Sequence, residues 1–234
     1  MSTPQPLHCR GQAYALLAEQ LPSLDTTRGL IRAAVAVAMH ELEDADLTSV
    51  EARLDELAHQ VRQRVHHDHP QALLAHAHEV LFEEEGFTGN REDYHNPRNS
   101  YLPVVLKTRR GIPITLAMIY KGVLERLGIR VCGINAPVHF LAGVQISETD
   151  FAEQGLMLVD PFHNGRVLLR EEAYQQIEQL TGARLPRDPA MLEPASHRQW
   201  LLRLLQNLIT SFDRLGRRDD LAAMIEMREL VESC

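Results

Sequence analysis

The segment that most constrains the fold lies near the middle of the chain and reads "IPITLAMIYKGVLERLG" (residues 112–128). Its apolar residues fall on most sides of a helix with 3.6 residues per turn. A helix that is apolar around most of its circumference is packed on several sides. Pro113 suits the first helical position and Gly128 suits the end. The segment therefore predicts a buried central helix over about residues 113–127, at the centre of the core.

Four short segments with strand-like composition follow this helix, and they read "RVCGIN", "HFLAGVQI", "LMLVD" and "RVLL". The last two flank "PFHNG", in which the pair Asn164-Gly165 favours a hairpin. Helical patterns lie on both sides of this block. We therefore predict an α+β fold, in which a small antiparallel sheet accompanies the central helix.

Amphipathic helices are predicted before and after the central block. Three precede it, over about residues 29–42, 50–65 and 70–85, after a lead-in with a short helix around Ala13 to Leu21. Thr48 and Glu51 match a capping box at the start of the second, and "GFTGN" ends the third. An antiparallel helix pair is predicted at 197–232. The predicted regions are 1–28 (lead-in), 29–95 (helical), 96–170 (core) and 171–234 (C-terminal helical).

Charge and composition exclude several classes of protein. The chain has 24 Lys and Arg against 32 Asp and Glu, a net charge of -8, which disfavours a nucleic-acid partner. Its longest apolar run near the N-terminus, "AAVAVAM", is too short to span a bilayer, so we expect a cytoplasmic protein without a membrane partner. Three cysteines, Cys9, Cys132 and Cys234, indicate neither a disulfide framework nor a zinc site.

The central block resembles a known family. The stretch "GFTGNREDYHNPRNSYLPVVLKTRRGIPITLAMIYKGVLERLGIRVCGINAPVHFL", followed by "VDPFHNG", is similar to the bacterial SirB N-terminal family of the transglutaminase-like superfamily. The resemblance begins at about Gly29 and includes the final helix pair, which in that family looks like a tetratricopeptide-type unit. It implies a papain/transglutaminase-like core, with a Cys at the start of a buried helix, a His on one strand and an Asp on the next.

Such a triad has a clear physical basis. A helix N-terminus lowers the pKa of a thiol, the His shares its proton, and the Asp orients the His. By resemblance, His139 in "PVHFL" matches the His and Asp160 in "VDPF" matches the Asp. The Cys position falls at or beside Pro113, which has no nucleophile. Val138 is a further departure, because the family tends to have Gly before this His.

Two other residues are candidates for a displaced nucleophile. Thr115 lies in the first turn of the predicted helix but about 200° around it from residue 113, so capping or packing is the competing role. Cys132 lies in an apolar strand, where an inert buried thiol is the competing role. His139 and Asp160 can equally be a structural relic of the triad that locks two strands together.

Metal binding is a third interpretation of the same residues. His139, Asp160 and His163 could be ligands with an open position, although their spacing is not diagnostic. The segment "HHDHPQALLAHAHE" also places His66, His69, His76 and His78 close in sequence, but these positions do not share one helical face. We expect solvated faces and a helix junction there, and we predict neither a metal nor a cofactor.

The loop "NPRNSYLP" carries polar groups that hold irregular backbone or contact a ligand. Arg98 could bind an acidic group with two hydrogen bonds. We take Arg98, Asn99, Arg109 and Arg110 as the candidate binding residues. The sequence thus predicts a non-catalytic transglutaminase-like protein that binds a protein partner. The alternative is a cysteine-protease-like hydrolase or acyl transferase that uses Thr115, Cys132 or a metal at His139 and Asp160.

Overall fold

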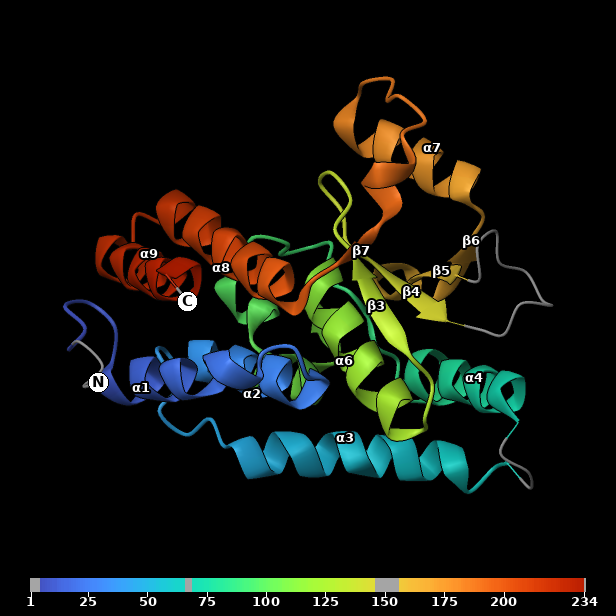
Figure 1. The fold of residues 1–234 in the computed structure, drawn as a ribbon, viewed down its shortest axis with the longest axis horizontal. Coiled ribbons are helices and arrows are strands. Elements are labelled where there is room, and N and C mark those ends of the chain that lie inside the picture. The colour runs from blue at the N-terminus through green and yellow to red at the C-terminus, as the bar shows by residue number, and fades with distance from the viewer. Residues whose placement is uncertain (1–4, 66–68, 146–155, 234) are drawn as a thin grey trace.

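The fold is built around one buried helix, α6 (Pro113–Arg126). The computed structural model describes residues 5–65, 69–145 and 156–233. Every residue of α6 from Pro113 to Leu124 is buried, and the helix ends before Gly128, which has a positive φ of 82°. It contacts α2 (Thr27–Ala38), α3 (Leu47–Arg62), α5 (Leu102–Thr108), α8 (His197–Arg214) and the sheet (Figure 1). The predicted central helix, packed on several sides, is confirmed.

A five-stranded antiparallel sheet lies against α6. Its strands, in spatial order, are β6 (Arg166–Leu168), β5 (Leu156–Asp160), β4 (Leu141–Gln145), β3 (Val131–Ile134) and β7 (Pro194–Ala195). The register pairs Ala142 with Val159. Consequently the start of β4 and the end of β5 lie side by side. The predicted small sheet and the β5–β6 hairpin are confirmed, and Asn164 has the positive φ of 55° that its place in the turn requires.

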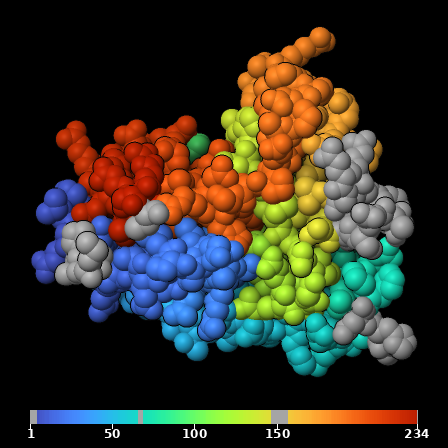
Figure 2. All heavy atoms as spheres, viewed as in Figure 1, coloured from blue at the N-terminus to red at the C-terminus, as the bar shows by residue number. Residues whose placement is uncertain are grey.

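The two faces of the sheet are covered by different helices. One face joins the main core with α6, and Trp200 of α8 lies against Gly133 and Phe140 there. The other face packs on α7 (Arg170–Thr181) through Ala173, Tyr174 and Ile177. The α7 region therefore projects from the body of the molecule (Figures 1 and 2).

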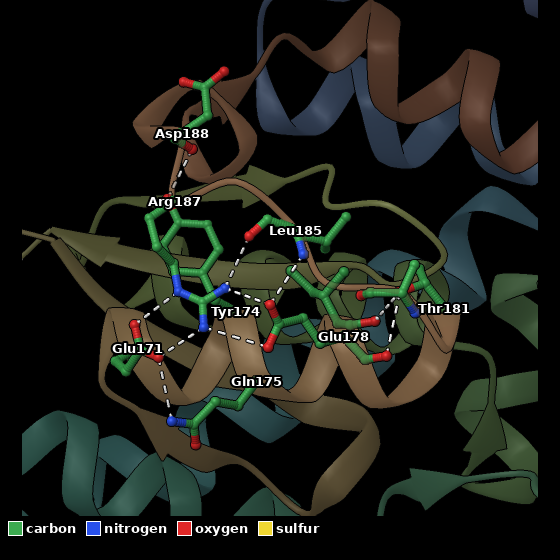
Figure 3. A network of polar contacts seen from close by, with 10 residues as sticks. Glu171, Tyr174, Gln175, Glu178, Thr181, Leu185, Arg187 and Asp188 are labelled. Carbon is green, nitrogen blue, oxygen red and sulfur yellow. Dashed lines mark hydrogen bonds and ion pairs between the residues drawn. The ribbon is translucent and has the colours of Figure 1, made fainter.

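An arginine fixes the chain that returns from α7. The Arg187 guanidinium pairs with Glu171 (2.9 Å) and Glu178 (2.6 Å), and it lies over the ring of Tyr174 (Figure 3). Tyr174 in turn donates a 2.7 Å hydrogen bond to the carbonyl of Asp188. These contacts hold residues 185–188 on α7, and they support the helix that contributes Gln176 to the site described below.

The N-terminal helices form the opposite part of the molecule. They are α1 (Gly11–Gln20), α2, α3 and α4 (Pro70–His78), and α4 continues as a π-helix, η2, over Glu79–Glu84. The predicted capping box at Thr48 is wrong. Asp46 is the N-cap of α3, and its carboxylate accepts from the backbone N–H groups of Thr48 and Ser49. A charged acceptor two residues earlier therefore takes the capping role.

Several elements of the central region are not predicted from the sequence. Residues 102–108 form α5 after the short 3₁₀ helix η3 (Pro97–Ser100), although this stretch reads as a Pro-bearing loop. The two-residue strands β1 (Thr88–Gly89) and β2 (Arg110–Gly111) pair in parallel just before α6. Together they fix the approach of the chain to the first turn of α6.

The C-terminal helices α8 and α9 (Arg218–Ser233) form the predicted antiparallel pair and dock on the N-terminal helices. Arg217, between them, pairs with Glu41 (2.7 Å) and with Asp220 (2.8 Å). One hydrophobic core includes residues from Cys9 to Val231, so it crosses all of the predicted region boundaries, and those boundaries stay a prediction. None of the helices in the described parts of the chain has the length and apolar character needed to cross a bilayer.

Candidate functional site

His139 and Asp160 meet where β4 begins and β5 ends. His139 lies two residues before β4, and Asp160 is the last residue of β5. Nε2 of His139 lies 2.9 Å from Oδ2 of Asp160, and the two side chains are only 4 % and 0 % exposed. The antiparallel register of the two strands produces this contact, so the sheet brings together the two residues that the resemblance had identified.

Asp160 is the centre of a larger polar cluster. Its Oδ1 accepts from the backbone N–H groups of Phe162 (3.0 Å) and His163 (3.3 Å), at the start of the 3₁₀ helix η5 (Pro161–His163). Its Oδ2 contacts the imidazole of His163 (2.7 Å) and the amide of Gln176 (2.6 Å). The carboxylate thus joins β5, η5 and α7. Gln176 had no sequence signal, because its position depends on how α7 docks.

These hydrogen bonds keep the carboxyl group of Asp160 ionised. Burial alone would raise the pKa of Asp160, because a carboxylate loses hydration in the interior. Hydrogen bonds from His139, His163 and Gln176 outweigh that cost and hold the pKa below its usual range. Asp160 is therefore an anion at neutral pH, and it is able to orient imidazoles or to bind a cation.

The first turn of α6 has no nucleophilic side chain at residue 113, the position where the resemblance places the cysteine of the triad. Pro113 is buried at the first turn, and the preceding residue, Ile112, is the N-cap. The helix contacts η5, which carries Phe162 and His163. The helix start and the acid–base pair of the resemblance are thus both present. Residue 113, however, is a proline, and its pyrrolidine ring cannot attack a carbonyl.

The two candidate substitute nucleophiles have different surroundings. Thr115 is completely buried, and its Oγ1 has no hydrogen-bond partner among the residues that the structure describes. Cys132 packs on the α7 face of the sheet, not on the α6 face, and its Sγ contacts the carbonyl of Gly143 (3.4 Å). Gly143 is four residues after His139, about 13 Å along an extended strand. The structure does not bring Cys132 to His139, and burial raises the pKa of its thiol.

The ring of Phe162 packs against the imidazole of His139. Phe162 makes edge-to-face contacts with His139 and with Tyr94, at ring-centroid distances of 6.0 Å in both pairs. A Cβ on Gly89 would lie 2.5 Å from the Phe162 ring, so only glycine fits there. The guanidinium of Arg91 lies 5.9 Å from the same ring. Phe162 therefore connects the β1–β2 pair to the site.

Val138, directly before His139, has a strained backbone. Its φ is 55°, and its side chain is 51 % exposed. A β-branched residue in the left-handed region is an outlier, whereas glycine enters it freely. Val138, which stands where the family tends to have Gly, thus lies at a position where the fold requires a left-handed backbone conformation. The apolar side chain of this strained residue is therefore exposed on the surface beside the site.

The four predicted binding residues do not form one group. Arg98 and Arg109 line a cavity of about 670 Å³ together with Lys107 and Arg53, and Arg109 also pairs with Glu85 (3.0 Å). Asn99 is buried, and its amide donates to the carbonyls of Asp93 (2.6 Å) and Tyr94 (3.2 Å), which is a structural role. Arg110 is exposed on β2 and lies outside that cavity.

The histidines of the segment 66–79 are separated by the fold. His66 lies outside the described residues. His69 is the N-cap of α4, His76 pairs with Glu79 (2.9 Å), and His78 is directed into the core, where it contacts the hydroxyl of Tyr120 (2.7 Å). Within the described ranges, His139, Asp160 and His163 form the only group of three that could hold a metal ion.

Comparison with known proteins identifies the superfamily of the chain. A family model described as the transglutaminase-like superfamily matches residues 48–206. A UPF0162 protein of Xylella fastidiosa (strain 9a5c) is 34 % identical over 199 residues, which is 83 % of this chain and 69 % of that protein. F-box only protein 21 of Homo sapiens is 31 % identical over 144 residues, 60 % of this chain and 21 % of that protein.

A UPF0162 protein of Pseudomonas aeruginosa is 30 % identical over 149 residues, 64 % of this chain and 51 % of that protein. No solved structure matches the chain significantly. Because the family match contains all of α6 and the strands around His139 and Asp160, the chain belongs to the transglutaminase-like superfamily, and the Xylella protein places it among the UPF0162 proteins.

Proposed function

We propose that this chain is a non-catalytic member of its superfamily, of the SirB N-terminal type, and that it works by binding a protein partner in the cytoplasm. One observation carries the proposal. Pro113 stands in the first turn of α6, whereas the buried His139–Asp160 pair is retained. A base without a nucleophilic side chain beside it has little to activate.

The hydrogen bonds of Asp160 support a structural role for the pair. Its carboxylate contacts His139, His163, Gln176 and two backbone N–H groups, so it holds β4, η5 and α7 in fixed positions. Removing one partner from such a buried network is costly. The pair is therefore retained for stability even when it does no chemistry.

Two surfaces are the candidates for partner binding. The first is the rim of the site, where Val138 and Tyr94 expose apolar surface. The second is the cavity at Arg98, Lys107 and Arg109, where Arg98 and Lys107 offer cations to an acidic group of the partner, although Asp44 and Asp46 also line it. The α8–α9 pair, as a tetratricopeptide-like unit, would extend the binding surface beyond the site.

The absence of catalysis is tested with the purified chain in a chelating buffer. Amide and ester substrates and thiol-directed probes are offered to the wild-type protein and to His139→Ala. We expect no turnover by either protein and slow labelling of Cys132, because burial raises its pKa. Turnover that disappears in His139→Ala would overthrow the proposal.

The binding surface is tested with paired variants. Val138→Asp places a charge at the rim of the site, and Val167→Asp places one on β6, where a valine is 48 % exposed. Proteins cross-linked to the wild-type chain in its native extract are identified and repurified, and their affinities are measured. A specific partner should lose at least about tenfold in affinity with Val138→Asp and little with Val167→Asp. Equal losses would exclude the rim as the binding surface.

One observation favours a second candidate, a hydrolase or acyl transferase with Thr115 as a displaced nucleophile. The Oγ1 of Thr115 is buried in the first turn of α6, and no described residue accepts or donates a hydrogen bond there. Thr115→Val removes only the hydroxyl and keeps the shape. Loss of turnover in this variant would establish the second candidate, whereas unchanged or higher stability would show a packing residue.

A further inference from the structure

We propose that His139, Asp160, His163 and Gln176 form a closed structural site for Zn²⁺ or a similar transition-metal ion. The proposal does not rest on the proposed function, because binding a protein partner requires no metal. It assigns a ligand to the cluster around Asp160, in which hydrogen bonding alone leaves one feature unexplained.

That feature is the crowding at a single oxygen. Nε2 of His139 (2.9 Å), Nδ1 of His163 (2.7 Å) and Nε2 of Gln176 (2.6 Å) all approach Oδ2 of Asp160. A carboxylate oxygen has two lone pairs, so three short contacts exceed what it accepts with good geometry. The nitrogen of Gln176 also lies 3.5 Å from Nδ1 of His163. A cation between the imidazoles and the carboxylate would replace two protons and relieve this crowding.

The three donor atoms already lie close enough to share one ion. The ligand atoms of His139, Asp160 and His163 are all within 4.8 Å of one another. Bonds of about 2.0–2.1 Å in a tetrahedral site separate the ligand atoms by about 3.3 Å. The contacts of His139 and His163 to Oδ2 must therefore lengthen by about 0.4 and 0.6 Å, and ligand atoms that lie further apart than about 3.3 Å must move closer together. His163 lies on a short 3₁₀ helix and is 29 % exposed, so it is able to make that movement.

The other oxygen of Asp160 is fixed in the way that metal ligands are fixed. The backbone N–H groups of Phe162 and His163 donate to Oδ1, at 3.0 and 3.3 Å, so the carboxylate plane is held and Oδ2 is directed at the imidazoles. Partners of this kind orient ligands and raise affinity in known metal sites. The site is therefore preorganised and does not need to be assembled by the ion.

The donor set indicates the kind of metal and its role. Two imidazoles and one carboxylate suit zinc and its neighbours, whereas calcium and magnesium prefer oxygen ligands. Rotation of the Gln176 amide by 180° would present its oxygen as the fourth ligand, since the two ends of an amide have the same shape. Gln176 thereby closes the site. An ion held there would join β4, β5, η5 and α7, and it would have no open position for a substrate.

The test uses the full chain, freed of metal with a chelator and titrated with Co²⁺ alone and Zn²⁺ alone. We expect one Co²⁺ per chain with the visible absorption of a tetrahedral site, displacement by Zn²⁺, and a higher unfolding temperature with Zn²⁺. His163→Leu should weaken binding at least about tenfold. The matched control is His76→Leu, which removes a histidine outside the cluster and should bind like the wild type.

A second variant keeps the proposal falsifiable if His163→Leu folds poorly. Gln176→Glu replaces the neutral fourth group by an anionic ligand, so Zn²⁺ should bind at least about tenfold more tightly. Binding that neither His163→Leu nor Gln176→Glu changes would overturn the proposal and show an adventitious ion only. Hydrolysis by the zinc-loaded chain would overturn the closed site and the proposed function together. Failure to bind metal would leave the proposed function untouched.

Discussion

Asp160 accepts a 2.9 Å hydrogen bond from His139, and the same carboxylate also contacts Gln176 on α7, so one buried anion connects the sheet to the helix that covers one of its faces. Asp160→Asn removes the charge and turns one acceptor into a donor. We expect the free energy of unfolding in a chelating buffer to fall by about 3 kcal/mol, measured with urea. Asp213→Asn, at an exposed position of α8, is the control and should change it little.

Pro113→Cys should restore a reactive thiol. The new side chain would lie in the first turn of α6, where the helix dipole favours the thiolate and where the resemblance places the cysteine beside the imidazole of His139. We expect labelling by iodoacetamide at neutral pH at least about tenfold faster than for Cys132, with His139→Ala abolishing the advantage. Thr115→Cys is the matched control on another side of the helix. Equally slow labelling of both introduced thiols would show that residue 113 does not face the imidazole.

The stability of the protein should decrease in mild acid because of His78. Burial lowers the pKa of His78 to about 4, whereas the unfolded chain titrates near 6.5. Between these values the unfolded state binds more protons, so the free energy of unfolding falls as the pH drops from about 6.5 to about 4, by up to roughly 3 kcal/mol.

The control for this pH dependence is His78→Gln, which does not titrate in this range and still reaches the hydroxyl of Tyr120. Urea unfolding at several pH values should show a smaller slope for the variant between pH about 6.5 and about 4. The slope that remains would come from the other titrating groups. An unchanged slope would contradict the assignment to His78.

Gly133 should tolerate no side chain. A Cβ at this position would lie 1.9 Å from the ring of Trp200, which is completely buried. Gly133→Ala should therefore reduce the free energy of unfolding by about 3 kcal/mol or more. Gly11→Ala, where a Cβ would meet nothing within 4 Å, is the control and should be neutral or slightly stabilising. Similar effects of both substitutions would contradict the close contact.

Val138→Gly should stabilise the protein by about 1 kcal/mol. Relief of the left-handed strain gains about 1–3 kcal/mol, and the added freedom of glycine in the unfolded chain offsets part of it. Val167→Gly on β6 removes an equally exposed valine without such strain and should destabilise. A loss of stability with Val138→Gly would mean that the exposed valine makes stabilising contacts.

Helices, strands and turns were predicted best where a periodic pattern of apolar residues ends at a residue, such as Gly, that favours the end of the element. The central helix, the strand over Leu156–Asp160 and the hairpin at Asn164-Gly165 follow such patterns. Choices between local structures of similar free energy, such as the cap or the type of a helix, were harder to predict. Asp46 and not Thr48 caps α3, and residues 79–84 continue α4 as a π-helix, because such choices depend on a few tenths of a kcal/mol.

The site divides in the same way. The central helix, the proline in its first turn and the two residue types, His and Asp, that the family resemblance assigns can all be predicted from the amino-acid sequence, because each depends on residues close together in the chain. The meeting of three nitrogen atoms at one oxygen of Asp160 could not be predicted in this way, because it requires the folded arrangement of the chain. Gln176 and His163 reach that oxygen through the docking of α7 and the turn after β5, and such contacts depend on packing between distant segments.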